Sequence, residues 1–199
     1  MSKIHPSNTI LVDADGVLLD WDMEFSAWMT KLGFVTAIEN HEKEYSIGKR
    51  YNITDEQAKR LIALFNESAR VGFMTPLRDA LFYVKKLHEE HGYYFHCITS
   101  LSNDPCAVKL REFNLRNLFG NGVFSKVICL PTGADKHQAL TAYSGTGCYW
   151  IEDKPENAEV GKSLGLRSVL MEHAHNANYK NEHIPRVKTW REIYEMITS

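Results

Sequence analysis

Two pairs of carboxylates, each at the end of an apolar run, are the residues of this sequence best suited to chemistry. Asp13 and Asp15 follow the run at residues 10–12 and are separated by one small residue. Glu152 and Asp153 follow a second run at residues 148–151. Carboxylates in this arrangement can bind a divalent cation, act as a nucleophile or transfer protons. For the first pair alone, an Asx-type turn, in which the acids accept hydrogen bonds from nearby amides, is an equally good interpretation.

Groups suited to holding a phosphate follow two further apolar runs. Thr99 closes the run at residues 93–99 and Ser100 follows it, where a hydroxyl and exposed backbone amides could bind a phosphoryl oxygen. Lys136 opens a helical pattern after the run at residues 123–130 and offers a point charge that suits phosphate. Each of these features is common when it occurs alone. Together with the two acidic pairs they predict a phosphate site built from four successive strand ends.

The pattern of elements predicts that these strand ends meet. Five segments have strand character, and most are separated by helical patterns, which is typical of a doubly wound α/β protein with a five-stranded parallel sheet between two layers of helices. In such a sheet, ligands collect at the carboxyl ends of the strands. The predicted strands are 9–14, 93–99, 123–130, 148–152 and 167–171, and the predicted helices of the core are 76–91, 107–113, 136–143, 157–164 and 189–196.

An insert follows the first predicted strand. Residues 20–74 contain helical periodicity and no strong strand candidate, and Thr54 to Gln57 reads as a capping box that opens a helix through Phe65. The insert is longer than one crossover helix requires. We therefore predict a small helical cap at residues 20–74, above the sheet end that carries Asp13 and Asp15, on a core formed by residues 1–19 and 75–199.

Composition excludes several classes of function. The chain has 199 residues, 24% of them charged, with a formal net charge of −2, so it has no global field to attract a polyanion. Nucleic-acid binding would need a local basic patch, and the sequence shows no strong one. No run is long enough to cross a bilayer and residues 1–6 have no signal-peptide core, so we expect a cytoplasmic protein without a membrane partner. The four cysteines form no C-x-x-C pair. His173 and His175 are two apart, which favours opposite sides of an extended loop over joint metal ligation.

The motifs DADGV, ITS, GADK and IEDK resemble, in order, the four motifs of the haloacid dehalogenase (HAD) superfamily. This resemblance implies a Rossmann-like core with a cap, dependence on Mg²⁺, and hydrolysis of phosphomonoesters. It implies Asp13 as nucleophile, Asp15 as general acid and base, and Thr99 and Lys136 as groups that hold the phosphoryl oxygens. The implied metal ligands are Asp13, Asp153 and the carbonyl of Asp15, with Glu152 tuning the metal site.

A closer resemblance is to the 5'(3')-deoxyribonucleotidases, carried by DADGVLLDWD, IEDKPEN, MEHAHN and RVKTWREI. It implies a nucleoside monophosphate as the partner, enclosed by the cap, with an aromatic at the position of Trp21 contacting the base. For the aromatic candidates, packing inside the cap is the competing interpretation, and a homodimer is left open. The candidate substrate-binding residues are Gly16, Trp21, Tyr45, Tyr51, Phe73, Ser100 and Lys154.

Departures from that family leave the substrate open. Its Pro-Leu-Pro-Gly segment is replaced by Pro76-Leu77-Arg78-Asp79, and the arginine two residues before its motif-three lysine is replaced by Ala134. A HAD phosphatase acting on another small phosphate ester, or on a nucleic-acid 3' phosphate, is the first alternative. A non-catalytic module that binds phosphorylated ligands is the second, and it gains little from clustered carboxylates facing a dianion.

Overall fold

A parallel sheet forms the centre of the protein in a computed structural model that describes residues 8–199, so the predicted leader at residues 1–6 lies outside the described residues. Within these residues the sheet has six strands in the order β3-β2-β1-β4-β5-β6, and every neighbouring pair is parallel. The prediction of a parallel α/β sheet is confirmed, with one strand more than the five predicted. The strands are β1 (Thr9–Val12), β2 (Tyr94–Ser100), β3 (Phe124–Leu130), β4 (Tyr149–Glu152), β5 (Arg167–Met171) and β6 (Arg186–Val187).

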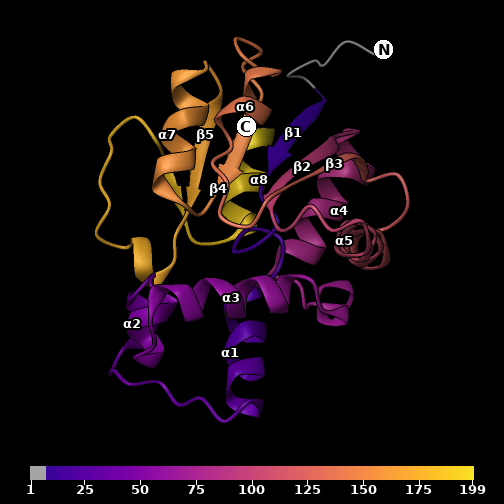
Figure 1. Ribbon diagram of the computed structural model, residues 1–199. Helices are drawn as coiled ribbons and strands as arrows, with labels where there is room; N and C mark the ends of the chain where they lie inside the picture. The colour runs from indigo at the N-terminus through magenta and orange to yellow at the C-terminus, as the bar shows by residue number, and fades with distance from the viewer. Residues whose placement is uncertain (1–7) are drawn as a thin grey trace.

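Helices cover both faces of the sheet, which gives the predicted three layers (Figure 1). Ile10 and Val12 of β1 belong to a buried cluster with α4 (Ala80–His91), α5 (Pro105–Phe119) and α8 (Trp190–Thr198). Leu11 belongs to a second cluster, with residues of α6 (His137–Thr141) and α7 (Pro155–Ser163). Alternate side chains of a strand point to opposite faces, so an unbroken apolar run is what a strand covered on both faces requires.

Two helices begin or end differently from the prediction. The helix expected from residue 76 begins at Ala80, because Arg78 has φ 43°, in the left-handed region that a helix does not contain. The helix expected over residues 107–113 is longer at both ends. Asp104 caps its start by accepting hydrogen bonds from the amides of residues 106 and 107 (both 2.9 Å), and the helix ends before Gly120.

The segment between β1 and α4 is helical and has its own buried cluster. It contains α1 (Trp21–Lys31), α2 (Ile47–Tyr51) and α3 (Asp55–Asn66), with the 3-10 turns η1 (His41–Lys43) and η2 (Ala69–Phe73). The predicted capping box is present: Thr54 accepts from the amide of Gln57 (3.2 Å), and the Gln57 side chain accepts from the amide of Thr54 (3.0 Å). Figure 1 shows α1, α2 and α3 gathered on one side of the sheet. We refer to this segment as the cap; its domain boundaries remain a prediction. The buried cluster comprises Phe25, Met29, Ile47, Tyr51, Ala58 and Phe65.

Two further features concern the chain as a whole. Among residues 8–199, no helix is both long enough and apolar enough to cross a membrane. All four cysteines carry free thiols, and Cys97 and Cys148 are buried.

Candidate active site

Asp13 lies directly after β1 and is almost wholly buried. Its Oδ1 accepts a hydrogen bond from the amide of Ala14 (2.7 Å), and its Oδ2 lies 2.7 Å from the Nζ of Lys136. The same Nζ lies 2.8 Å from Oε2 of Glu152. Burial alone would lower the pKa of Lys136, but the carboxylates of Asp13 and Glu152 outweigh burial and raise it. A permanently charged ammonium is therefore shared by two buried acids.

Asp13, Glu152 and Asp153 form an acidic cluster whose carboxylate oxygens are suited to binding a divalent cation. One carboxylate oxygen from each residue lies within 4.8 Å of the others. Burial and the nearby Glu152 and Asp13 carboxylates raise the pKa of Asp153 well above its usual range. With one ammonium for three carboxyl groups, ionising all three would leave excess negative charge, which a hard cation with oxygen ligands would offset. The residues present thus fit Mg²⁺.

Asp15 is not part of this cluster and contacts a different cation. Its Oδ1 accepts from Nη1 of Arg111 on α5 (2.7 Å), and the guanidinium of Arg111 is completely buried. Burial raises the pKa of Asp15, although the charge of Arg111 opposes the shift. The sequence analysis missed Arg111. The available signal was its spacing of four from the buried Ala107 and Leu115, which places a charged side chain on the apolar face of a predicted helix.

Thr99 and Ser100 occupy the end of β2 as predicted, but their hydroxyls differ in surroundings. Thr99 is fully buried, and among the described residues its Oγ1 has no hydrogen-bond partner. Ser100 donates its hydroxyl hydrogen to the carbonyl of Ala134 (2.7 Å). Ser100 therefore links the loop after β2 to the loop before α6, whereas the Thr99 hydroxyl is buried and unpaired among the described residues.

Gly16 occupies a position that a side chain would disrupt. It has φ 74°, and a Cβ built on it would lie 2.4 Å from Oδ2 of Asp153. Its carbonyl accepts from Nε2 of His173 (2.6 Å). Because Gly16 has no side chain, Asp153 can lie close to the backbone at the exit of β1.

His173 and His175 lie beside the acidic cluster, and their predicted placement on opposite sides of an extended loop was wrong. The rings are stacked, with centroids 5.5 Å apart and planes 4° apart. Nε2 of His175 lies 3.7 Å from Oδ2 of Asp153. The reason is local: the chain forms a 3-10 turn, η3 (Ala174–Asn176), where the prediction assumed extended backbone.

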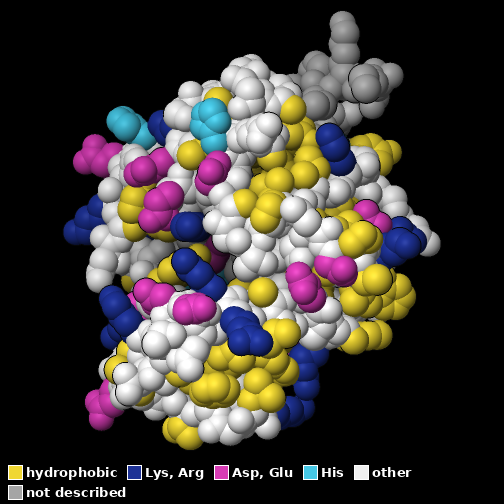
Figure 2. Space-filling view, in the orientation of Figure 1, with side chains coloured by type: hydrophobic (Ala, Val, Ile, Leu, Met, Phe, Trp, Pro, Cys, Tyr) yellow, Lys and Arg dark blue, Asp and Glu magenta, His cyan; other side chains and the backbone are white. Residues whose placement is uncertain are grey.

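Tyr45 is the cap aromatic that the structure brings to the acids. Its ring centroid lies 5.3 Å from that of His175, and Nζ of Lys154 lies 5.8 Å from the same ring. Although 59% of its surface is exposed, desolvation together with the negative charge of Asp153 raises the pKa of Tyr45 to about 12. Lys154 also donates its amide hydrogen to Oε1 of Glu152 (3.1 Å). Figure 2 shows charged side chains of both signs gathered where the cap meets the core.

The other cap candidates have different surroundings. Trp21 stacks on Phe25, with centroids 4.5 Å apart, and donates its indole hydrogen to Asn66 (3.0 Å). Tyr51 is only 6% exposed and belongs to the buried cluster of the cap, as the packing interpretation expects. Phe73 is 69% exposed, and its ring contacts that of Phe113 on α5 (5.8 Å), with no described contact to the acids.

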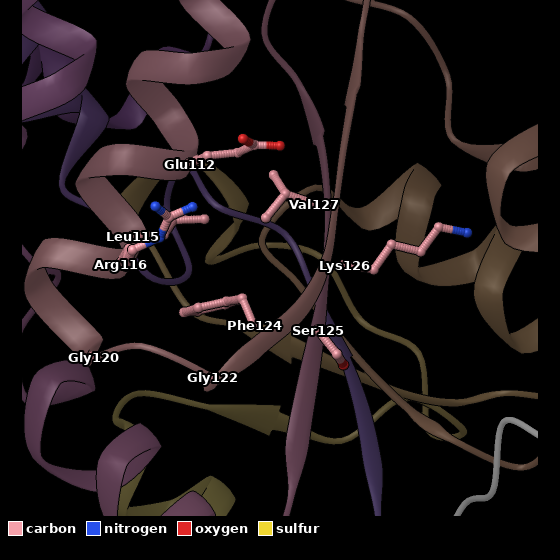
Figure 3. Close-up of a pocket in the computed structure, with 9 residues that line it drawn as sticks. All are labelled: Glu112, Leu115, Arg116, Gly120, Gly122, Phe124, Ser125, Lys126 and Val127. Atoms are coloured by element: carbon pink, nitrogen blue, oxygen red, sulfur yellow. The ribbon is translucent and has the colours of Figure 1, made fainter. Parts of the chain in front are cut away.

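A separate pocket of about 170 Å³ lies between α5 and β3 (Figure 3). Glu112, Arg116 and Phe124 are among its lining residues, and Lys126 points away from Glu112 and Arg116 in this view. None of the predicted site residues lines it. It is therefore distinct from the candidate active site.

Comparison with known proteins identifies a relative in a bacteriophage. No model of a known protein family matches the chain. An uncharacterised 32.4 kDa protein in the Gp30–rIII intergenic region of Enterobacteria phage T4 is 34% identical over 203 residues, covering 96% of this chain and 70% of the phage protein. The chain belongs to the family of this phage protein.

Several solved structures with a fold similar to that of this chain are HAD-type hydrolases. A predicted phosphatase from Clostridium acetobutylicum has a TM-score of 0.65 and 13% identity, covering 96% of this chain and 98% of that one. A putative HAD hydrolase from Bacillus subtilis bound to magnesium has a TM-score of 0.59 and 14% identity, covering 99% of this chain and 100% of that one. CbbY from Rhodobacter sphaeroides in complex with phosphate has a TM-score of 0.59 and 15% identity, covering 94% of this chain and 96% of that one. At these identities the likeness establishes the HAD-like α/β fold. It does not separate 5'(3')-deoxyribonucleotidases from other HAD proteins.

Proposed function

We propose that the protein is a Mg²⁺-dependent phosphomonoester hydrolase that forms an aspartyl-phosphate on Asp13, with a nucleoside monophosphate as substrate, as in a 5'(3')-deoxyribonucleotidase. The observation that carries the proposal is the position of Asp13, which is both 2.7 Å from the buried Lys136 ammonium and part of the acidic cluster with Glu152 and Asp153. The magnesium and the phosphate bound by two structures of the same fold support it.

Asp13 is the nucleophile in this mechanism. An Asp13 oxygen forms a bond to phosphorus while the bond from phosphorus to the leaving oxygen breaks. Lys136 is fixed by its contacts to Asp13 and Glu152, so its charge lies beside the reacting centre before substrate arrives. The Thr99 hydroxyl, which has no partner among the described residues, donates to a phosphoryl oxygen.

Asp15 transfers the protons. Its carboxyl group gives a proton to the leaving oxygen in the first step, and its carboxylate takes a proton from the attacking water in the second. That water forms the new bond to phosphorus, and the bond between phosphorus and Asp13 breaks, which regenerates both acids. The separate contacts of Asp13 to Lys136 and of Asp15 to Arg111 support this division of roles.

Asp13, Glu152 and Asp153 would hold Mg²⁺, together with the carbonyl of Asp15. When bound, the ion supplies positive charge that offsets the charge of the phosphate dianion and of the nucleophile. Gly16 keeps this arrangement compact because its backbone approaches Asp153 more closely than any side chain would allow.

For a nucleotide substrate, the groups at the mouth of the site are the ones to bind the nucleoside. Tyr45 offers a flat, partly exposed ring and Lys154 a positive charge beside it. Stacking of a base on an aromatic side chain contributes about 1 to 3 kcal/mol. Trp21 contributes to this site less directly, because its ring is already stacked on Phe25.

The test is release of phosphate in the presence of Mg²⁺ from deoxy- and ribonucleoside 5' and 3' monophosphates, sugar phosphates and phosphoglycolate. The Asp13→Asn variant tests the nucleophile, and Asp135→Asn, an exposed acid next to Lys136, is the matched control. We expect turnover of deoxynucleotides that is lost in Asp13→Asn and in EDTA and kept in Asp135→Asn. Asp13-dependent turnover of another ester alone would refute the nucleotide assignment, and absence of metal-dependent turnover of every ester would refute the hydrolase.

A further inference from the structure

Within residues 8–199, Arg111 is a buried charge with one ionic partner. Its side chain, in the middle of α5, has no exposed surface, and its Nη1 donates to Oδ1 of Asp15, 96 residues away in the chain (2.7 Å). Its Nε and Nη2 have no hydrogen-bond partner among the described residues. Burying a guanidinium with two unused donors costs free energy. The protein therefore retains Arg111 at a cost to its stability.

The surroundings of Arg111 direct its charge to Asp15. The nearby thiols are those of Cys97 and Cys129; burial raises the pKa of both, that of Cys129 to about 11, so both are neutral. Glu112 is the next residue in α5, but no ion pair between it and Arg111 occurs within residues 8–199. Buried ion pairs often stabilise a fold no more than apolar residues of similar size would. The effect of the Arg111–Asp15 pair that concerns the site is therefore to fix the orientation of the Asp15 carboxylate.

The geometry of the pair leaves half of the Asp15 carboxylate available. Arginine and carboxylate groups frequently pair through two parallel hydrogen bonds that occupy both oxygens. Here a single nitrogen of Arg111 contacts a single oxygen of Asp15, and the Asp15 side chain remains 21% exposed. Arg111 holds Oδ1, and no described residue donates a hydrogen bond to Oδ2, which leaves Oδ2 able to exchange a proton. Asp13, by contrast, has its Oδ2 held by Lys136.

We propose that Arg111 is a positioning residue that holds Asp15 in the orientation needed for proton transfer to and from the ester oxygen and the attacking water. This inference rests on the proposed hydrolase function. It assigns no contact between Arg111 and substrate, because the observed hydrogen bond of the guanidinium is to Asp15.

The test compares esters that differ in their need for a general acid. Departure of p-nitrophenolate needs little protonation, whereas departure of the alkoxide of a nucleoside 5' phosphate needs a proton. In Arg111→Met we expect kcat for the alkyl ester to fall by about 100-fold or more and kcat for p-nitrophenyl phosphate by less than about tenfold, because general acid catalysis contributes about 10² to 10⁴. Asp15→Asn should give the same pattern, and the double variant should lose little more than either single variant.

Two further variants separate positioning from folding. Arg116→Met, an exposed arginine on the same helix, should leave both rates unchanged. Arg111→Lys keeps the charge and should retain more alkyl-ester activity than Arg111→Met; it also provides the comparison if Arg111→Met does not fold. Equal losses for both esters in the Arg111 variants would overturn the proposal.

A crystal structure of an Arg111 variant gives a readout that does not depend on activity. We expect the Asp15 carboxylate to rotate or become disordered while the contact between Asp13 and Lys136 persists. An unchanged Asp15 orientation would overturn the inference even if the wild type is an active phosphatase. If Asp15 is displaced in the variant but the wild type hydrolyses none of the esters of the panel, the positioning role is supported and the hydrolase function is refuted.

Discussion

Replacing Lys136 by methionine is the most informative single perturbation of the site, because one buried ammonium serves two buried carboxylates. Lys136 is 1% exposed, and its Nζ lies 2.7 Å from Asp13 and 2.8 Å from Glu152. Methionine has a similar length, so Lys136→Met removes the charge with little change in packing. Both acids then remain buried without their cation.

The expected cost follows from this geometry. Removing one partner of a buried ion pair costs about 3 to 5 kcal/mol, because the remaining charge is left uncompensated. Domains of this kind are stable by about 5 to 15 kcal/mol, so Lys136→Met should lose a large part of the free energy of unfolding. Neutralising the second acid as well, in Lys136→Met/Glu152→Gln, should recover about 1 to 3 kcal/mol.

Urea unfolding in EDTA, followed by circular dichroism, measures these differences. Lys109→Met, an exposed lysine on α5, is the control and should change the free energy of unfolding by less than about 0.5 kcal/mol. Repeating the titrations with Mg²⁺ should reduce the deficit of Lys136→Met, since a bound cation stabilises the folded state. The reasoning is refuted if Lys136→Met costs less than about 1 kcal/mol in EDTA, or if the double variant is no more stable than the single.

Two other predictions concern one backbone position and one histidine. Gly16→Ala places a Cβ 2.4 Å from Oδ2 of Asp153, whereas Gly33→Ala, at a similar positive φ, places a Cβ with nothing within 4 Å. Both variants should lose about 1 kcal/mol of stability to backbone strain. Only Gly16→Ala should abolish the stabilisation by Mg²⁺ that thermal unfolding measures. Burial and the charge of Lys126 lower the pKa of His96 in the folded state from its usual 6.5. At a pH between the folded-state and unfolded-state pKa values, the unfolded state binds more protons, so the free energy of unfolding falls as the pH falls below about 6.5. The stability advantage of the wild type over His96→Gln, measured by urea unfolding from pH 8 to pH 5, should therefore shrink with acidity; an advantage that grows would contradict this sign.

The layers and the sheet could be predicted because their signals are local. β1 is buried on both faces, and its run of apolar residues records that burial directly. The strand β6 has only two residues, Arg186 and Val187, and is defined by pairing with β5. Two residues carry no periodicity, so nothing in the sequence distinguishes this strand from a loop.

The components of the site that were missed are set by contacts between distant segments. The ion pair of Arg111 with Asp15 joins α5 to the exit of β1, and sequence spacing contains no measure of that distance. Similarly, His173 reaches the carbonyl of Gly16, 157 residues earlier in the chain. Spacing could place Arg111 on the apolar face of its helix, but the partners of Arg111 and His173 are set by the three-dimensional structure.

The spacing of two between Asp13 and Asp15 has a structural cause that unites these contacts. After Asp13 the chain turns tightly, and the carbonyl of Ala14 accepts from the amides of residues 18 (2.8 Å) and 19 (2.9 Å). Asp13 therefore contacts Lys136, which precedes α6 on one face of the sheet, while Asp15 contacts Arg111 of α5 on the other. A spacing of one would lack the intervening residue at which the chain turns. Two carboxylates that share one sheet end thus have separate cations, which is the arrangement that the proposed division of roles requires.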